Sequence, residues 1–325
     1  PEAKTSNRSF ENVILMPMTK DTSTLTISLI SNRRQIAGSI TETISPTDIL
    51  IRKTGEEPAP YEVLNKAADQ EKCIHIAFLA EGYTDKEMDK FINDARIATD
   101  AIFAHEPFRK YQDRFQVIAV KSASEDSGTS VPSKGIWKKT ALGSNFDTFY
   151  SERYLTTLNL NRVHDCLAGT PYEHIIILVN TDVYGGGGIL NFYNLSSPGH
   201  KAYKPVIVHE FGHSFAGLAD EYAYENDPLE LYPSDIEAWE ANITTLVNFH
   251  GKWEDMIAPK TKVPTPLSKK PEDIKNKVGL FVGAGYNTKT VYRGMQDCRM
   301  RTNTNPDFCK VCQRALEKLI KFYTE

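Results

Sequence analysis

The sequence predicts an α/β domain over residues 71–325, preceded by a small β-rich module over residues 1–70. Apolar strand patterns alternate with helical patterns between residues 74 and 180, an order typical of a sheet with crossover helices. A largely apolar helix follows the third strand pattern and begins near Pro205. The first 70 residues, in contrast, are rich in Thr, Ser, Ile and Val.

Alternation of polar and apolar residues predicts the strands of the N-terminal module. In "TSTLTISLI", Leu25, Ile27 and Leu29 fall on one face of a half-buried strand. The stretch "SPTDILIRK" from Ser45 looks similar, and "GEEPAPYEV" from Gly55 has the proline and charge of a linker. We expect a sandwich-like module that leans on the following domain, because its apolar content is thin.

The α/β domain is expected to begin with an apolar strand over residues 74–79. Thr84 and Glu87 form a capping-box pattern that predicts the start of a helix. "FQVIAVK" from Phe115 and "PYEHIIILVN" from Pro171 are apolar runs of strand length. The chain therefore runs strand, helix, strand, helix, strand.

Charge and hydropathy exclude some classes of function. The formal net charge is −4 and no long basic stripe is visible, so nucleic acid is not an expected partner. No apolar run approaches the roughly 20 residues of a membrane helix, so no transmembrane segment is expected. The sequence begins with Pro1 rather than methionine. We therefore expect that a preceding segment, either a signal peptide or another stretch of chain, has been removed.

The stretch "VIVHEFGHSF" from Val206 predicts a metal site. His209 and His213 are four residues apart and share one face of a helix, where their ring nitrogens can bind a single zinc ion. Glu210 can then act as general base toward a water molecule, a pattern of metalloproteases. The alternative is a buried helix whose histidines bond to backbone carbonyl groups. The apolar surroundings favour the metal site, because burying these polar groups is costly without coordination.

The expected third ligand is Asp220, which follows a glycine turn. The metal helix is expected to stop at Gly217, where a positive φ would bring the following carboxylate back to the ion. Glu221 is the competing ligand; if Asp220 faces the ion, Glu221 is expected to orient a histidine N–H. The other alternative is an exposed acidic turn.

The segment "HEFGHSFAGLADEY", His209 to Tyr222, resembles the zinc-binding signature of the bacterial IgA metallopeptidase family. That family is similar to the metzincins, although the third ligand here is Asp rather than His and its spacing differs by one residue. The resemblance implies an α/β (α+β) metzincin-like zinc peptidase domain with a mixed sheet, an active-site helix and one catalytic Zn²⁺. It also implies a methionine beneath the metal, for which "CRMR" favours Met300 over Met295.

Substrate and oxyanion contacts are expected from segments near the helix. "YGGGG" lies just upstream, and Gly186 and Gly187 would let a substrate backbone pair with an edge strand; a flexible loop is the alternative. The candidate hydrogen-bond donors to the oxyanion are Tyr222, Tyr286 and Tyr292.

Three clustered cysteines, Cys298, Cys309 and Cys312, have two expected states. One is a disulfide from Cys298 to either of the others, and the second is three free thiols in a reducing compartment. A second zinc ion is not expected, because no histidine lies within ten residues.

These observations together predict a zinc-dependent endopeptidase, secreted, periplasmic or at the bacterial cell surface, that cuts a protein or peptide. The family name suggests immunoglobulin A, but no residue indicates cleavage specificity. Two alternatives stay open: a non-catalytic binding module with a structural zinc, and a zinc amidase acting on a non-peptide amide.

Overall fold

The computed structural model describes residues 14, 16, 19–51, 54, 55, 57–148, 151, 152, 154–225 and 231–325. Its centre is a six-stranded mixed sheet with the strand order β3-β5-β4-β6-β8-β7. The inner strands β5, β4, β6 and β8 are parallel, while β3 and β7 run antiparallel at the two edges. The strands are β3 (Tyr61–Asn65), β4 (Ile74–Glu81), β5 (Phe115–Val120), β6 (His174–Val179), β7 (Gly186–Gly188) and β8 (Asn194–Ser196).

The predicted α/β domain with a mixed sheet is confirmed, and so are its first three strands, which are β4, β5 and β6. The first predicted helix is also confirmed: a short 3-10 turn at Asp85–Glu87 leads into α1 (Met88–Phe103). The Glu87 carboxylate accepts the backbone N–H of Thr84 at 2.9 Å, as in a capping box.

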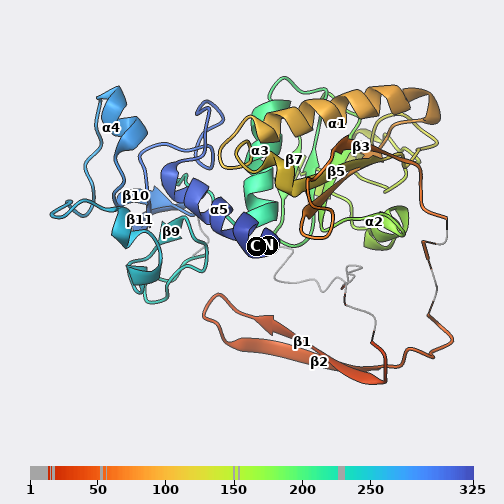
Figure 1. Cartoon of the computed structure of the whole chain (residues 1–325), viewed down its shortest axis with the longest axis horizontal. Helices are drawn as coiled ribbons and strands as arrows, with labels where there is room; N and C mark the ends of the chain where they lie inside the picture. Colours follow the sequence, from red (N-terminus) through yellow and green to blue (C-terminus); the bar gives the residue numbers. More distant parts are fainter. Residues whose placement is uncertain are drawn as a thin grey trace.

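Helices cover both faces of the sheet (Figure 1). Alternate residues of β4 point to opposite faces, so that Ile76 and Phe78 join a core with α1, α3 (Tyr203–Ala216) and α5 (Lys310–Thr324). Ala77 and Leu79 join a second core with α2 (Leu160–Leu167). Both faces are thus buried, which explains why β4 to β6 read as continuous apolar runs.

A smaller three-stranded antiparallel sheet, in the order β10-β11-β9, stands beside the main domain (Figure 1). Its strands are β9 (Ile243–Thr244), β10 (Phe281–Ala284) and β11 (Asn287–Arg293), and α4 (Pro271–Asn276) precedes β10. No pattern in the sequence predicted this sheet.

The N-terminal hairpin consists of β1 (Ser23–Ile30) and β2 (Ile36–Ile44), paired antiparallel in a sheet of their own. The predicted strand over "TSTLTISLI" is confirmed, but Leu29 is 69% exposed, so this face is only partly buried. The strand expected from Ser45 is wrong, since residues 45–51 form turns. Ile49 and Leu50 are nearly fully exposed there, and no strand among the described residues pairs with this segment. Within the described residues, no helix is long and apolar enough to cross a membrane.

Candidate metal centre

Helix α3, which carries the two candidate histidine ligands, ends as predicted. Gly217 has a φ of 58° and its N–H donates to the carbonyl oxygen of His213 at 2.9 Å, while the N–H of Leu218 donates to Gly212 at 3.2 Å. A Cβ at Gly217 would lie 2.7 Å from the ring of Trp239, so both the positive φ and the neighbouring side chain require glycine. Pro205 is the third residue of the helix, within its first turn.

Both histidines of α3 are oriented by backbone carbonyl groups. The Nδ1 of His209 donates to the carbonyl oxygen of Arg299 at 2.9 Å, and the Nδ1 of His213 donates to that of Leu218 at 2.5 Å. With Nδ1 protonated, each neutral ring presents a bare Nε2 lone pair. The two Nε2 atoms face each other at 3.1 Å. Backbone bonding was expected for a plain core helix, but that interpretation does not explain why two lone pairs converge.

Asp220 completes the group. Its Oδ1 lies 3.0 Å from the Nε2 of His209 and 3.2 Å from that of His213, and its side chain is almost fully buried. Its Oδ2 accepts a hydrogen bond from the Tyr286 hydroxyl. The Gly285 N–H donates to the Asp220 carbonyl at 2.8 Å, so the turn before β11 holds both the backbone and the side chain of Asp220.

The geometry and chemistry of these three donor atoms fit a zinc ion. Ligands bound about 2.0–2.1 Å from zinc at the tetrahedral angle are about 3.3 Å apart, close to the separations of 3.0, 3.1 and 3.2 Å found here. Burial alone would lower the pKa of His213, but the hydrogen bond and charge of Asp220 outweigh it and raise the pKa to about 9, so that without an ion a proton competes for the Nε2 lone pair that would bind the metal. In the same way the two histidines hold the pKa of Asp220 well below its usual range against the effect of burial. The pocket therefore strongly favours a cation.

Glu210 lies in the same turn of α3 and beside the edge strand β7. A Cβ at Gly186 would lie 3.7 Å from the Cγ of Glu210, and one at Gly188 would collide with the Glu210 carbonyl oxygen. A Cβ at Gly187, in contrast, would meet nothing within 4 Å. The glycines thus let β7 approach the helix directly next to Glu210, and β7 is an edge strand as the sequence analysis expected.

Met300 lies directly beneath the metal helix. It is fully buried, and its Sδ is 2.6 Å from the position that a Cβ of Gly212 would occupy. Its carbonyl oxygen accepts the N–H of Glu221 at 2.8 Å. Met295, the second choice, belongs to the same core, and its Sδ accepts the Lys310 N–H at 3.4 Å.

Two of the three tyrosines expected near the metal lie at Asp220, and the third lies elsewhere. Tyr222 and Tyr286 pack against each other, with ring centroids 5.4 Å apart, and the backbone N–H of Tyr286 donates to Tyr222 at 3.0 Å. Both therefore lie at Asp220. Tyr292 lies in β11, paired with Thr244 and Val282, and packs against the main core.

Glu221 does not orient a histidine, so that expectation is wrong. The Nδ1 atoms of the two histidines are bonded to Arg299 and Leu218 instead. Glu221 is fully buried and turns away toward the cysteines, where the Cys312 thiol donates to its Oε1 at 3.0 Å. The exposed acidic turn is wrong as well, because Asp220 and Glu221 are both buried.

All five cysteines are free thiols in this structure. Of the two states expected for the cluster near the C-terminus, the structure therefore has the three free thiols. The Sγ atoms of Cys298 and Cys312 are 3.6 Å apart, much farther than the roughly 2.0 Å of a disulfide bond.

Comparisons with known proteins place this geometry in context. A search of curated proteins gives no match. A family model described as IgA Peptidase M64 matches residues 63–277 and 269–320. These ranges include His209, His213 and Asp220 as well as the three cysteines near the C-terminus.

Proposed function

Because the chain belongs to the IgA Peptidase M64 family, we propose that this peptidase-family hydrolase is a zinc-dependent endopeptidase. His209, His213 and Asp220 would hold the ion. The observation that carries this proposal is the convergence of two bare Nε2 lone pairs and one carboxylate oxygen within 3.2 Å of one another. The order of helix, glycine turn, third ligand and buried methionine supports a metzincin-like arrangement with Met300 as the floor of the site.

The number of protein donors favours a catalytic site over a structural one. Among the described residues, this group has three potential ligands, and Glu210 lies next to it on the same helix. Three protein ligands leave a coordination position for water or substrate, whereas structural zinc sites are closed by four. This supports an enzyme rather than a binding module with a structural zinc.

Zinc, when bound, supplies Lewis acidity toward water and toward a carbonyl oxygen. The chain's own residues do the rest. Glu210 takes the proton of the attacking water and delivers it to the leaving amine nitrogen. Tyr286 holds Asp220 through Oδ2, so that Oδ1 stays turned toward the histidines. The Tyr222 hydroxyl is the proposed donor to the developing oxyanion.

Substrate binding is proposed at β7. Among the described strands, only β8 pairs with β7, so the other edge of β7 can pair with an extended peptide. Gly187 leaves open space where a side chain would stand. An extended peptide bound there would lie beside Glu210, which is what peptide-bond cleavage requires.

The substrate and the location are part of the same proposal. The family description names IgA, an extracellular antibody, so we propose a protein substrate of this kind and a location outside the bacterial cytoplasm: secreted, periplasmic or at the cell surface. A zinc amidase acting on non-peptide amides is the competing enzyme class. Comparing hydrolysis of casein, IgA and small acylated amides separates the two.

The decisive experiment measures proteolysis and bound zinc together. A general base usually contributes at least about 100-fold to the rate. Glu210→Gln is therefore expected to lose at least this factor in kcat while keeping its zinc. Metal-stripped wild-type protein should be inactive and recover with added zinc. Glu272→Gln, which removes the same charge on α4, serves as the control and should stay active. Full proteolysis by Glu210→Gln would refute the proposed role.

A further inference from the structure

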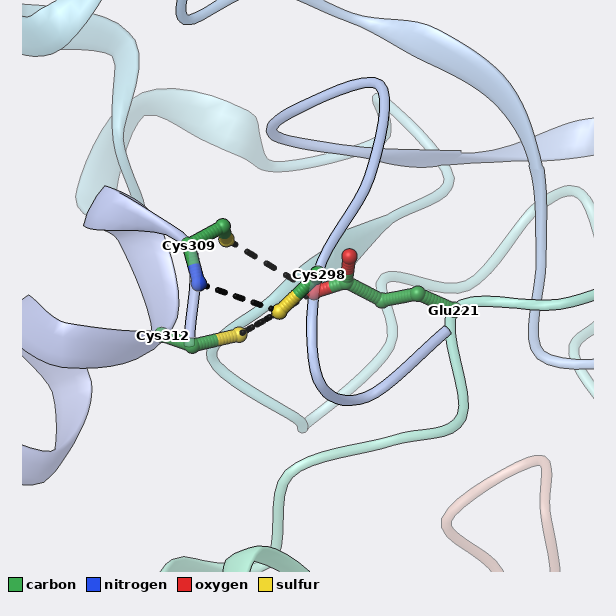
Figure 2. Close-up of side chains that lie close together, drawn as sticks. All are labelled: Glu221, Cys298, Cys309 and Cys312. Carbon is green, nitrogen blue, oxygen red and sulfur yellow. Dashed lines mark hydrogen bonds between the residues drawn. The ribbon is translucent and has the colours of Figure 1, made fainter. Parts of the chain in front are cut away.

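A second group of side chains that could hold a metal ion lies next to the first, because Glu221 follows Asp220 directly. Glu221, Cys298, Cys309 and Cys312 come from three separate segments, and their side chains point toward one another (Figure 2). All four are buried, and one ligand atom from each lies within 4.8 Å of the other three. None of these residues has a role in the proposed hydrolysis.

The separations in this group correspond to shared coordination. Two thiolates bound about 2.3 Å from zinc at the tetrahedral angle are about 3.8 Å apart, and the Sγ atoms of Cys298 and Cys312 are 3.6 Å apart. The Glu221 Oε1 lies 3.0 Å from the Sγ of Cys312 and 4.0 Å from that of Cys309. One ion between these four atoms would need only small movements of side chains.

The carboxylate of this group is buried with an incomplete set of hydrogen bonds. Glu221 accepts the Asn242 amide at 3.0 Å through Oε1, but its buried Oε2 has no hydrogen-bond partner among the residues that the structure describes. A buried carboxylate oxygen without a partner is costly. The side chain of Arg293, itself 3% exposed, is close enough for the charges of Glu221 and Cys298 to act on it.

The helix dipole and a backbone N–H act on the sulfur atoms in the direction that favours thiolates, opposite to the effect of burial, which raises the pKa of Cys298 and of Cys312. Cys309 is the N-cap of α5 and Cys312 lies in its first turn, where the helix dipole stabilises negative charge. The N–H of Cys309 donates to the Sγ of Cys298 at 3.1 Å. A disulfide between two of the sulfur atoms would use neither the third thiol nor the unpaired Glu221 oxygen.

We propose that Cys298, Cys309, Cys312 and Glu221 form a second metal site that binds a structural zinc ion. Thiolate sulfur selects zinc over hard cations such as calcium and magnesium. Four protein donors close the coordination sphere, as is usual for structural zinc, in contrast to the three donors of the first site.

The second site would support the first through short covalent and hydrogen-bonded links. Glu221 follows Asp220 directly, and its N–H donates to Met300. Cys298 precedes Arg299, whose carbonyl oxygen orients His209. An ion held by Glu221 and Cys298 would therefore fix both the loop that carries Asp220 and the turn beneath α3.

The test is the metal content and metal spectroscopy of the full chain. We expect two zinc ions per wild-type chain and one per chain in the His209→Ala, His213→Ala double variant. The ion retained by the double variant should show zinc–sulfur scattering near about 2.3 Å in X-ray absorption. When cobalt replaces it, a strong sulfur-to-cobalt charge-transfer band should appear. This readout does not depend on peptidase activity, so failure of the second site and failure of the proposed function are distinguishable.

Variants of the second site provide the matched comparison. Cys312→Ser and Glu221→Gln should each lower the zinc content toward one ion per chain. Cys73→Ser and Glu240→Gln, which change a buried cysteine and a buried glutamate elsewhere, should retain both ions. The proposal is overturned if the wild-type chain holds one ion and the double variant holds none. It is also overturned if the ion of the double variant has no sulfur ligand, or if mass analysis of the unreduced protein shows a disulfide within the cluster. Because these measurements on the double variant leave the cysteines intact, the test remains valid if Cys312→Ser fails to fold.

Discussion

The Nδ1 of His209 donates to the carbonyl oxygen of Arg299 at 2.9 Å, across 90 positions of the sequence. This bond fixes the imidazole ring so that Nε2 faces Asp220. It also joins the metal helix to the turn that contains Met300, which packs beneath Gly212 of the same helix. The orientation of this candidate metal ligand therefore depends on a loop that only tertiary structure brings near it.

Tyr286→Phe is expected to weaken metal binding at the first site. The variant keeps the ring but removes the hydroxyl that donates to the Oδ2 of Asp220, and loss of such a supporting bond typically costs about 10–100-fold in metal affinity. Competition with a chromophoric chelator measures the affinity. Tyr292→Phe, the same change in β11, is the control. Equal zinc affinity in Tyr286→Phe and the wild-type protein would show that Asp220 needs no such support.

Gly188→Ala is expected to destabilise the protein, whereas Gly187→Ala is not. A Cβ at Gly188 would collide with the carbonyl oxygen of Glu210, while one at Gly187 would meet open space. Overpacking of this kind costs about 1–3 kcal/mol in the free energy of unfolding, or roughly 2–4 °C in Tm for each kcal/mol. Thermal unfolding of the two variants side by side checks the prediction. Equal melting temperatures would mean that β7 does not press against α3.

The local sequence was enough to predict the elements that carry the first site. The capping box at Thr84 and the end of α3 at Gly217 depend on short-range backbone chemistry, and both are confirmed. The long apolar runs predicted β4, β5 and β6 because these strands are buried on both faces. The stretch from Ser45 shows the limit of this reasoning. Its apolar residues are exposed in turns, because a strand pattern without a partner strand has nothing to pair with.

The elements that the sequence did not predict depend on long-range contacts. In the smaller sheet, β9 has two residues and β10 has four, and only two of the seven residues of β11 are buried, so strand pairing leaves little trace in local periodicity. Glu221 was assigned to a histidine because it follows Asp220. Only the fold brings it to three cysteines that lie more than 70 residues further along the chain.

Gly212→Ala is expected to destabilise the protein through Met300. Alanine favours a helix over glycine by about 1 kcal/mol, but the new Cβ would lie 2.6 Å from the Sδ of Met300 and 3.1 Å from the ring of Phe308. Because both neighbours are buried, we expect the overpacking to outweigh the helix propensity. A double-mutant cycle with Met300→Ala measures the coupling by chemical denaturation, and Gly212→Ala should cost at least about 1 kcal/mol less in that background. Additive free energies would place Met300 elsewhere than beneath the helix.

His174→Phe is expected to change how the stability of the protein depends on pH. His174 begins β6, its ring centroid lies 4.8 Å from that of Phe215 on α3, and burial lowers its pKa to about 4 although the charge of Glu173 opposes this. Between pH 4 and the unfolded pKa of about 6.5, the unfolded chain binds a proton that the folded chain does not, so the free energy of unfolding falls as the pH falls.

In this interval the wild-type protein should lose roughly 2 kcal/mol more stability than His174→Phe, a value discounted from the full shift because the ring is partly exposed. Chemical denaturation of both proteins at a series of pH values measures this difference, in which losses of stability shared by the two proteins cancel. Parallel stability curves would mean that His174 takes up its proton in the folded protein as readily as in the unfolded chain. The ring would then not be buried against the aromatic side chains of α3.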